Sequence, residues 1–322
     1  MSALDQLFAN VRVQANIFNN AQYCGLWAVD TSGSRRLSFH VVSAGRCALH
    51  IEDQTIELSK GDAVFFPQDA RHKIASLGAN VNEVVVNTAT AIELSQGLQA
   101  DGTALICGNF SHNNPLFDRL LSQLPTAIIL RHSNTQSSNA ASQLHKSRHE
   151  DTKHIGVTEC RGSTVVLMQL LLDEAWAVGE AQSALLNRLA DCLLYLLLRD
   201  HLPTQTGAFA AMSHPKLSAA MSFMHSSYHQ KLTVDTIAAQ SFMSRSAFAR
   251  QFKEVVGESP LEYLTQWRMS KAYTLLAEEG ASTLAAAIEV GYDSEAAFSK
   301  AFKRVTGFGP GQARTNLLEQ QI

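Results

Sequence analysis

The sequence predicts an α+β protein: an N-terminal β-barrel with a leucine-rich helix pair, followed by an all-α C-terminal domain. Three observations predict this class. Short runs rich in Val, Ile and Phe, broken by Gly, Asn and Asp, occupy residues 21–130 and are typical of a small barrel or jelly roll. Strongly apolar helical segments begin at residue 163. From residue 213 onward one helical pattern occurs twice, which indicates two helix-turn-helix units joined by a long helix.

The composition is that of a globular protein with two domains. The 322 residues are 46% hydrophobic and 17% charged, with a formal net charge of −3, so bulk charge alone does not indicate a nucleic-acid partner. The five scattered cysteines include no C-x-x-C pair, which favours a reducing compartment. The N-terminus lacks the basic-then-apolar order of a signal peptide, and the apolar run 192–198 is too short to span a bilayer. We therefore expect a cytoplasmic protein without a membrane partner.

One segment of the predicted barrel carries a motif. In KGDAVFFPQDARH, Gly61, Pro67 and His72 keep the order G-x5-P-x-G-x2-H, with Asp69 in the place of the second glycine. The segment resembles the second motif of the cupin family, whose barrel encloses a ligand or metal cavity. The resemblance implies a small-molecule effector bound in the barrel.

A metal site is a narrower hypothesis. Metal-binding cupins use several histidines and a glutamate, but here His40 stands alone where a His-x-His pair is expected, and the glutamate is absent. No cofactor is certain; the candidate is Zn²⁺ held by His40, His72 and Cys107, because mixed His and Cys ligands suit this ion. The alternative is two hydrogen-bonded histidines and a small buried thiol. His145 and His149 lie in a Ser- and Asn-rich segment that is typical of a polar loop.

The segments 163–176 and 183–202 are predicted to form a helix pair. The second has a wide apolar face made of Leu185, Leu186, Leu189, Leu193, Leu196 and Leu197. Such a face favours a homodimer interface; the alternative is burial against the same chain's barrel. The Pro, Gly and Thr that follow break the periodicity, which predicts a linker at 203–212 between a domain of residues 1–202 and one of residues 213–322.

The helical repeat has a spacing of fifty residues. Ser244, Phe248, Phe252, Lys253, Val255, Gly257 and Pro260 recur as Ser294, Phe298, Phe302, Lys303, Val305, Gly307 and Pro310. The phenylalanines share one helix face, the serines stand at N-cap positions, and the glycines stand where a helix would stop. A shorter helix is expected before each copy, at 233–241 and 283–290, so each copy completes a helix-turn-helix.

The segment 259–279 is expected to be the helix between the two units. Ser259, Pro260 and Glu262 form a capping box with proline at the first helical position. At about 1.5 Å per residue this helix spans roughly 30 Å, close to the ~34 Å of one DNA turn. The separation therefore suits two helices that enter successive major grooves.

Residues 213–314 resemble the DNA-binding domain of the AraC/XylS family of bacterial transcription regulators. The segments that carry the resemblance are HPKLSAAMSFMH, SRSAFARQFKEVVGESPLEYLTQWRMSKAYTLL and GYDSEAAFSKAFKRVTGFGPGQAR. The sequence departs from the family at Gly309, where a serine more often caps the helix that begins at Pro310. The N-terminal part is similar to the cupin-type sensor domains of the same family.

The resemblance implies sequence-specific binding to promoter DNA. Base contacts are expected from Ser246, Ala249 and Arg250 in the first recognition helix and from Glu295, Ala296, Ser299 and Lys300 in the second. Arg250 suits guanine and Glu295 a cytosine amine. Phosphate contacts are expected from Arg245, Lys253, Lys303 and Arg304.

The function that follows is a ligand-responsive transcription regulator, activator or repressor, without catalytic residues. Its expected partners are double-stranded promoter DNA, a small-molecule effector, RNA polymerase and a second copy of the chain. One alternative is a cupin enzyme, a metal-dependent oxygenase or isomerase, fused to a DNA-binding module; the incomplete ligand set counts against it. Another is a constitutive DNA-binding protein whose barrel serves only as a dimer scaffold.

Overall fold

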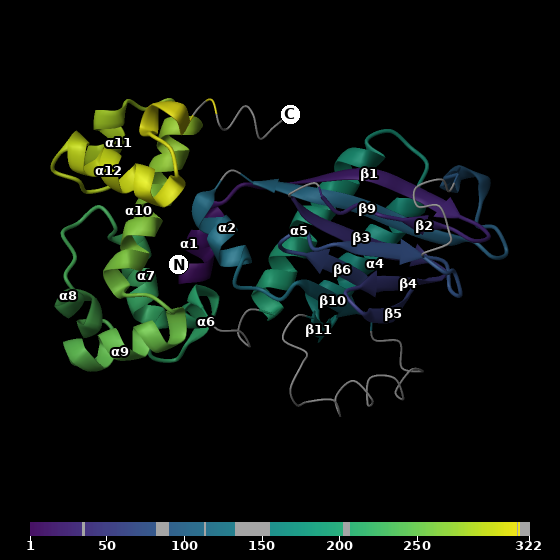
Figure 1. Ribbon diagram of the computed structural model, residues 1–322, viewed down its shortest axis with the longest axis horizontal. Helices are drawn as coiled ribbons and strands as arrows, with labels where there is room; N and C mark the ends of the chain where they lie inside the picture. The colour runs from purple at the N-terminus through teal and green to yellow at the C-terminus, as the bar shows by residue number, and fades with distance from the viewer. Residues whose placement is uncertain are drawn as a thin grey trace. The chain divides into compact units, whose positions relative to one another are not determined.

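The computed structural model describes residues 1–33, 36–81, 90–112, 114–132, 155–201, 207–313 and 315. The chain divides into two compact units (Figure 1). The sheet unit comprises Gln14–Ser111 and Leu124–Leu197, and the helical unit comprises Met1–Val13, His112–Gln123 and Leu198–Ile322. This division differs from the boundary expected at residues 203–212, because two N-terminal segments pack with the C-terminal helices.

The sheet unit contains two sheets, with strand orders β11-β10-β6-β3-β9-β1-β8 and β2-β7-β4-β5. The strands of the first sheet are β1 (Val13–Tyr23), β3 (Leu37–Ala44), β6 (Ala63–Phe66), β8 (Ile92–Glu93), β9 (Thr103–His112), β10 (Ala127–Arg131) and β11 (Ile155–Glu159). Those of the second are β2 (Ala28–Val29), β4 (Arg46–Ile51), β5 (Gln54–Ser59) and β7 (His72–Ala75). β3 pairs antiparallel with β6 and β9, whereas β10 and β11 are parallel. The sheet-rich N-terminal part of the predicted fold is confirmed.

The core of the sheet unit brings side chains of both sheets together. Val42 and Phe66 of the larger sheet share one apolar cluster with Leu49 and Ile74 of the smaller one. β3, at the centre of the larger sheet, is buried at every residue, as expected for a strand covered on both faces. A short 3-10 helix, η1 (Leu94–Gln96), lies between β8 and β9.

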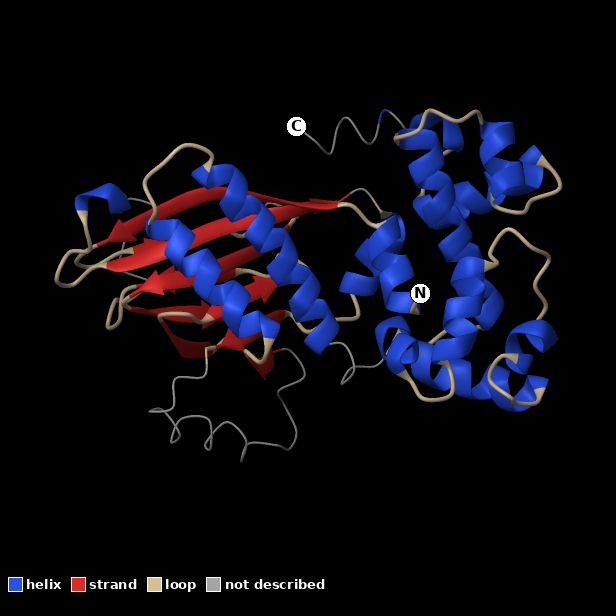
Figure 2. Ribbon diagram, turned by 180° about the vertical axis from the view of Figure 1, so that it is seen from behind, coloured by secondary structure: helices blue, strands red, loops and turns tan. Residues whose placement is uncertain are grey.

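Two helices, α4 (Ser163–Trp176) and α5 (Gln182–His201), lie across one face of the larger sheet (Figure 2). Asp191 of α5 accepts a hydrogen bond from the backbone amide of Ala15 in β1 at 2.6 Å, and Asn187 accepts one from Ile17 at 2.9 Å. The predicted leucine-rich helices therefore exist, and two side chains of α5 accept hydrogen bonds from backbone amides of β1.

The helical unit contains the two predicted helix-turn-helix units. Its helices are α1 (Ala3–Asn10), α2 (Pro115–Leu121), α6 (Ala208–Ser213), α7 (Ser218–Ser226), α8 (Val234–Ala239), α9 (Arg245–Val256), α10 (Pro260–Ala277), α11 (Thr283–Glu289), α12 (Glu295–Thr306) and η3 (Pro310–Gln312). α8 and α9 form the first unit and α11 and α12 the second, and Figure 1 shows α9 and α12 at opposite ends of α10.

The helix boundaries follow from local chemistry. Ser244 and Ser294 cap α9 and α12 by accepting from the backbone amide three residues later, and both helices end at a glycine in the left-handed region, with φ of 90° and 87°. Ser259 and Glu262 form the predicted capping box of α10. α10 has 18 residues, or about 27 Å at 1.5 Å per residue.

The structure differs in detail from the expected linker and from the expected helix at Pro310. The helix α6 occupies Ala208–Ser213, within the stretch expected to be a linker, and residues 203–206 lie outside the described residues. Pro310 begins a 3-10 helix, η3, whose N-cap Gly309 provides no side-chain hydrogen bond. Within the described residues, none of the helices is both long enough and apolar enough to cross a membrane.

Candidate nucleic-acid interface

The two recognition helices, α9 and α12, bury the same face. Phe248 and Phe252 are buried in α9, as are Phe298 and Phe302 in α12, and the ring centroids in each pair are 5.6 Å apart. Since the buried faces match, the remaining faces of the two helices also correspond position by position.

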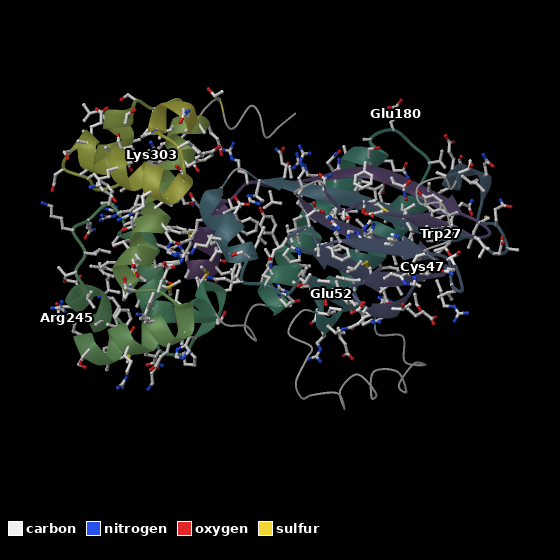
Figure 3. All side chains as sticks on the ribbon, in the orientation of Figure 1. Trp27, Cys47, Glu52, Glu180, Arg245 and Lys303 are labelled. Atoms are coloured by element: carbon white, nitrogen blue, oxygen red, sulfur yellow. The ribbon has the colours of Figure 1, made fainter. Side chains whose placement is uncertain are left out.

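Most of the predicted DNA contacts lie on the exposed faces. The exposed residues are Arg245, Ser246, Arg250 and Lys253 in α9, and Glu295, Ala296, Lys300, Lys303 and Arg304 in α12; Ala249 and Ser299 are half-buried. Figure 3 shows Arg245 on the first helix-turn-helix unit and Lys303 on the second. The structure therefore places basic side chains on both recognition helices.

The cations of α9 are held only weakly by protein carboxylates. Arg245 Nη1 lies 3.4 Å from Asp235 Oδ2, and Arg250 Nε lies 3.9 Å from Glu254 Oε1, with both partners of each pair mostly exposed. Exposed ion pairs typically contribute less than about 1 kcal/mol. Both guanidinium groups can therefore exchange these partners for a phosphate or a base edge at small cost.

The spacer helix α10 contacts both recognition helices through aromatic side chains. The rings of Phe252 in α9 and Tyr263 in α10 have centroids 6.0 Å apart. At the other end, Met269 and Tyr273 of α10 share an apolar cluster with Phe302 of α12. The position of both recognition helices therefore depends on α10.

Two further helices of this unit, α1 and α2, were not predicted from the sequence. Local signals for both exist, because Ser2 and Asp5 form a capping box at α1, and Asn114 caps α2 with Pro115 at its first position. These signals identify helices but contain no information about which unit the helices join. Only their packing shows that they belong with α10.

Inside the sheet unit, His40 and His72 meet as predicted. Their Nε2 atoms are 3.0 Å apart, and Thr31 Oγ1 lies 3.0 Å from the first and 3.2 Å from the second. His72 Nδ1 donates to the carbonyl oxygen of Ala70 at 2.7 Å, which leaves its Nε2 as an acceptor. Burial lowers the pKa of both imidazoles, that of His40 well below its ordinary value, so the pair is neutral.

Cys107 does not complete a metal site with this pair, and the predicted zinc set of His40, His72 and Cys107 is not assembled. Among the residues that the structure describes, no group of three or more His, Cys, Asp or Glu side chains is arranged to hold a metal ion. Cys107 Sγ instead lies 3.8 Å from Asn19 Nδ2, and burial raises the pKa of the thiol to about 12. His145 and His149 lie outside the described residues.

Comparisons with known proteins agree with both halves of this description. Residues 2–150 match the cupin family, and residues 237–316 match a helix-turn-helix domain. The chain is 28% identical to a protein of Streptomyces lividans and 29% identical to one of Streptomyces antibioticus, both named as AraC-like transcription regulators, with 98% of each chain covered. AlkR of Acinetobacter baylyi, named an HTH-type transcriptional regulator, is 27% identical over 94% of this chain and 96% of its own.

Three findings now coincide. The sheet unit has the cupin-type strands, the helical unit has two helix-turn-helix units with basic exposed faces, and two relatives named as AraC-like transcription regulators align from end to end. The chain belongs to the AraC family: it is a helix-turn-helix transcription regulator that binds double-stranded DNA and carries an N-terminal cupin domain.

Proposed function

We propose that α9 and α12 enter successive major grooves of one promoter site. The observation that carries this proposal is the match between the two helices, which share caps, stops and buried faces and stand at opposite ends of one 18-residue helix. A spacer of about 27 Å that carries a recognition helix at each end suits the ~34 Å repeat of the duplex.

The exposed side chains divide into base-reading and phosphate-binding groups. Arg250 can bind guanine through two hydrogen bonds, and Glu295 can accept from a cytosine amine, while Lys300 extends from the exposed face of α12. The remaining base-facing positions hold the small side chains of Ser246, Ala249, Ala296 and Ser299. Direct readout is therefore sparse, and Arg245, Lys253, Lys303 and Arg304 provide affinity through phosphates.

Replacing Arg250 with alanine tests the base-reading role. The preferred duplex is first selected from a random pool with the wild-type protein, and affinities are then measured for every single-base variant of that duplex. Arg250→Ala is expected to cost about 1–3 kcal/mol of binding free energy and to relax the preference at one position. Arg161→Ala removes an equally exposed guanidinium from the sheet unit and serves as the matched control, with unchanged affinity.

Two outcomes of this experiment would contradict different parts of the proposal. A wild-type protein that selects no sequence from the pool would contradict sequence-specific binding as such. An Arg250→Ala variant that keeps both the affinity and the base preferences would show that this face of α9 does not meet the bases.

The sheet unit is proposed to bind a small-molecule effector that controls DNA binding as activator or repressor. Thr31, His40 and His72 provide polar atoms beside an interior made of Trp27, Phe66 and other apolar side chains, a combination typical of ligand sites. Control requires that the effector bind the two DNA-binding states with different affinity. The aligned relatives are named as regulators, which favours this role over an oxygenase or isomerase.

The remaining partners follow from this function. We propose a homodimer formed through α4 and α5, where Val166, Leu170 and Leu185 are at least half-exposed. RNA polymerase is a further partner that regulation of transcription implies, and the cytoplasm is the compartment in which promoter DNA is reached.

A further inference from the structure

Three polar side chains from distant parts of the chain meet in the interior of the helical unit. Asn10 of α1 donates through Nδ2 to Ser270 Oγ of α10 at 2.7 Å, and Ser270 Oγ donates to Asn114 Oδ1 at 2.8 Å. Asn114 Nδ2 closes the triad by donating to the Asn10 carbonyl oxygen at 3.4 Å. All three residues are buried, at 6% exposure or less.

The hydrogen bonds of this triad fix the position of α1 and α2 along α10. Asn114 Oδ1 also caps α2 by accepting from the amides of Leu116 and Phe117. A buried amide or hydroxyl group without a partner is costly, so sliding of α1 or α2 along α10 would leave several such groups unpaired. Apolar packing alone would permit such movement, whereas the triad allows one register.

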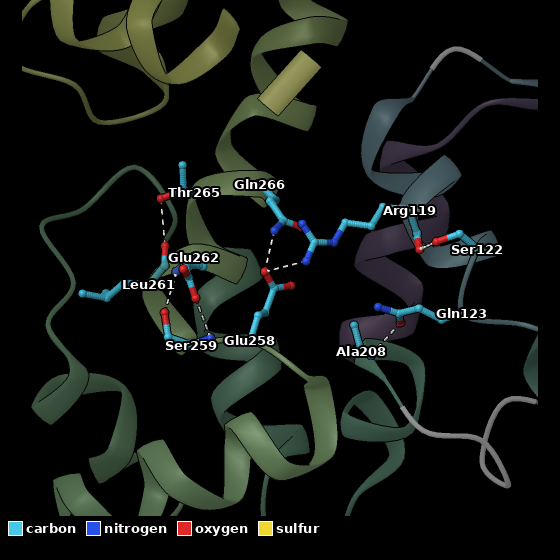
Figure 4. A network of polar contacts seen from close by, with 10 residues as sticks. All are labelled: Arg119, Ser122, Gln123, Ala208, Glu258, Ser259, Leu261, Glu262, Thr265 and Gln266. Carbon is cyan, nitrogen blue, oxygen red and sulfur yellow. Dashed lines mark hydrogen bonds and ion pairs between the residues drawn. The ribbon is translucent and has the colours of Figure 1, made fainter. Parts of the chain in front are cut away.

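A second polar network joins α2 to the start of the spacer helix (Figure 4). Arg119 Nη2 lies 3.1 Å from Glu258 Oε2, and the same oxygen accepts from Gln266 Nε2 of α10. Glu258 is 8% exposed and lies between the last residue of α9 and the first of α10. Arg119 therefore holds the joint between the first recognition helix and the spacer.

The other end of α10 is also contacted. Glu278 is the C-cap residue of α10. Its Oε2 lies 3.1 Å from Nη1 of Arg12, which follows α1. The two N-terminal segments therefore contact α10 at its start, through Glu258, at its middle, through Ser270, and at its end, through Glu278.

Both helices are joined directly to strands of the sheet unit. α1 ends at Asn10 and β1 begins at Val13, while β9 ends at His112 and α2 begins at Pro115, so two residues separate each helix from its strand. β1 and β9 are neighbours in the larger sheet. The chain segments that join these strands to α1 and α2 are therefore short.

We propose that α1 and α2 are positioning elements of the DNA-binding unit, which hold α10 in place and thereby fix the spacing of α9 and α12. Asn10, Asn114, Ser270 and Arg119 are the positioning residues. They do not contact DNA; they act on the geometry with which the two recognition helices meet it. This inference rests on the proposed function of α9 and α12.

The test measures spacing preference rather than affinity alone. The full chain is titrated with selected duplexes in which the two groove sites keep the wild-type separation or are moved by up to about five base pairs, half a helical turn. A duplex with only the first groove site is measured in parallel. Wild type is expected to lose about tenfold or more in affinity when the sites move out of phase, because only one helix then reaches its groove.

The variants are Ser270→Ala and Asn114→Ala, with Asn20→Ala as the matched control in the sheet unit, where the Asn20 amide donates to the Ala175 carbonyl oxygen at 2.8 Å. The triad variants are expected to lose most of the spacing preference while single-site affinity stays at the wild-type value. Asn20→Ala is expected to keep the preference, and Ser270→Thr, which retains the hydroxyl, to restore it. Hydrogen exchange along α10 is expected to increase only in the alanine variants of the triad.

Folded triad variants that keep the wild-type spacing preference would overturn the proposal. If these variants do not fold, Arg119→Ala provides the same measurement, because its side chain is 49% exposed and its loss leaves the apolar packing of α2 in place; an unchanged preference there also overturns it. Failure of wild type to bind any selected duplex would instead contradict the proposed function of α9 and α12.

Discussion

At the scale of single residues, Phe242 has a strained backbone in the turn between α8 and α9. Its φ of 52° lies in the left-handed region, where the equivalent turn of the second unit has Gly291 with φ of 81°. In both turns the amide of the following residue donates to the carbonyl five residues earlier, which establishes the equivalence. The Phe242 side chain is 99% exposed, so no burial offsets a strain that typically costs about 1–3 kcal/mol.

Replacing Phe242 with glycine is therefore expected to stabilise the helical unit. We expect the free energy of unfolding to rise by about 1 kcal/mol, since the gain from relieved strain exceeds the entropy that glycine adds to the unfolded chain. Hydrogen exchange of the helical unit in the full chain measures this change without interference from the sheet unit.

The opposite substitution in the second turn is the control. A Cβ at Gly291 would lie 2.4 Å from the carbonyl oxygen of His229, so Gly291→Ala is expected to destabilise the unit. A less stable Phe242→Gly variant would show that the exposed ring contributes to the fold in a way that its accessibility does not indicate.

At the scale of helices, one imidazole connects α1, α7 and α10. His225 of α7 donates through Nδ1 to the Ala3 carbonyl oxygen of α1 at 3.1 Å, and its Nε2 accepts from the Tyr263 hydroxyl of α10 at 2.6 Å. The ring stacks on Trp267 with centroids 3.6 Å apart. Burial lowers the pKa of His225 to about 3, so the neutral form is the one that holds these helices together.

This contact predicts a pH dependence of stability. An imidazole in the unfolded chain has a pKa of about 6.5, so between this value and about 3 the unfolded state binds more protons than the folded state. The contribution of His225 is therefore complete above about pH 6.5 and is lost as the pH falls, by about 2 kcal/mol at pH 5. Hydrogen exchange of α7 and α10 at several pH values measures it.

His225→Gln is expected to lack this part of the pH dependence, and His229→Gln, which replaces an exposed histidine of the same unit, to retain it. Equal slopes for wild type and His225→Gln between pH 7 and pH 5 would mean that the buried imidazole is not the group that titrates on unfolding.

At the scale of the whole molecule, the helix pair of the sheet unit presents apolar side chains to solvent. Leu186, Leu193 and Leu197 of α5 are buried, as the alternative of packing within the chain predicted, but Leu170 of α4 and Leu185 of α5 remain about half-exposed. Most of the predicted leucine face is therefore covered within the chain, and the exposed apolar side chains that remain lie on both α4 and α5.

Native mass spectrometry of the full chain is expected to show a dimer with a retained small molecule in the sheet unit. Leu170→Glu is expected to shift the mass to a monomer and to weaken binding to promoter DNA by tenfold or more, because two linked DNA-binding units gain avidity. Leu98→Glu introduces the same charge at an equally exposed leucine in a loop and is expected to remain dimeric. A monomeric wild type would contradict the proposed dimer. A wild type that retains no added mass would contradict the proposed effector.

The recognition helices were predictable because every signal they use is local. A serine at the start, a glycine at the end and phenylalanines four residues apart each act within one or two helical turns. The outward positions of α9 and α12 then followed from the position of the buried face; the assignment of these positions to bases or phosphates came from the family resemblance. Cys107 was not predictable in this way, because its distance from His40 and His72 depends on how separate strands pair.

The amino-acid sequence by itself determined where α9, α10 and α12 begin and end, and which of their side chains face outward. Only the tertiary structure decided that α1 and α2 pack on α10, and that His40 and His72 meet with no third His, Cys, Asp or Glu from the described residues to complete a metal site. The physical reason is the sequence separation of the interacting residues. Caps and periodicity involve neighbours along the chain. An apolar helix face or a buried amide, in contrast, can pair with any complementary surface that folding brings to it.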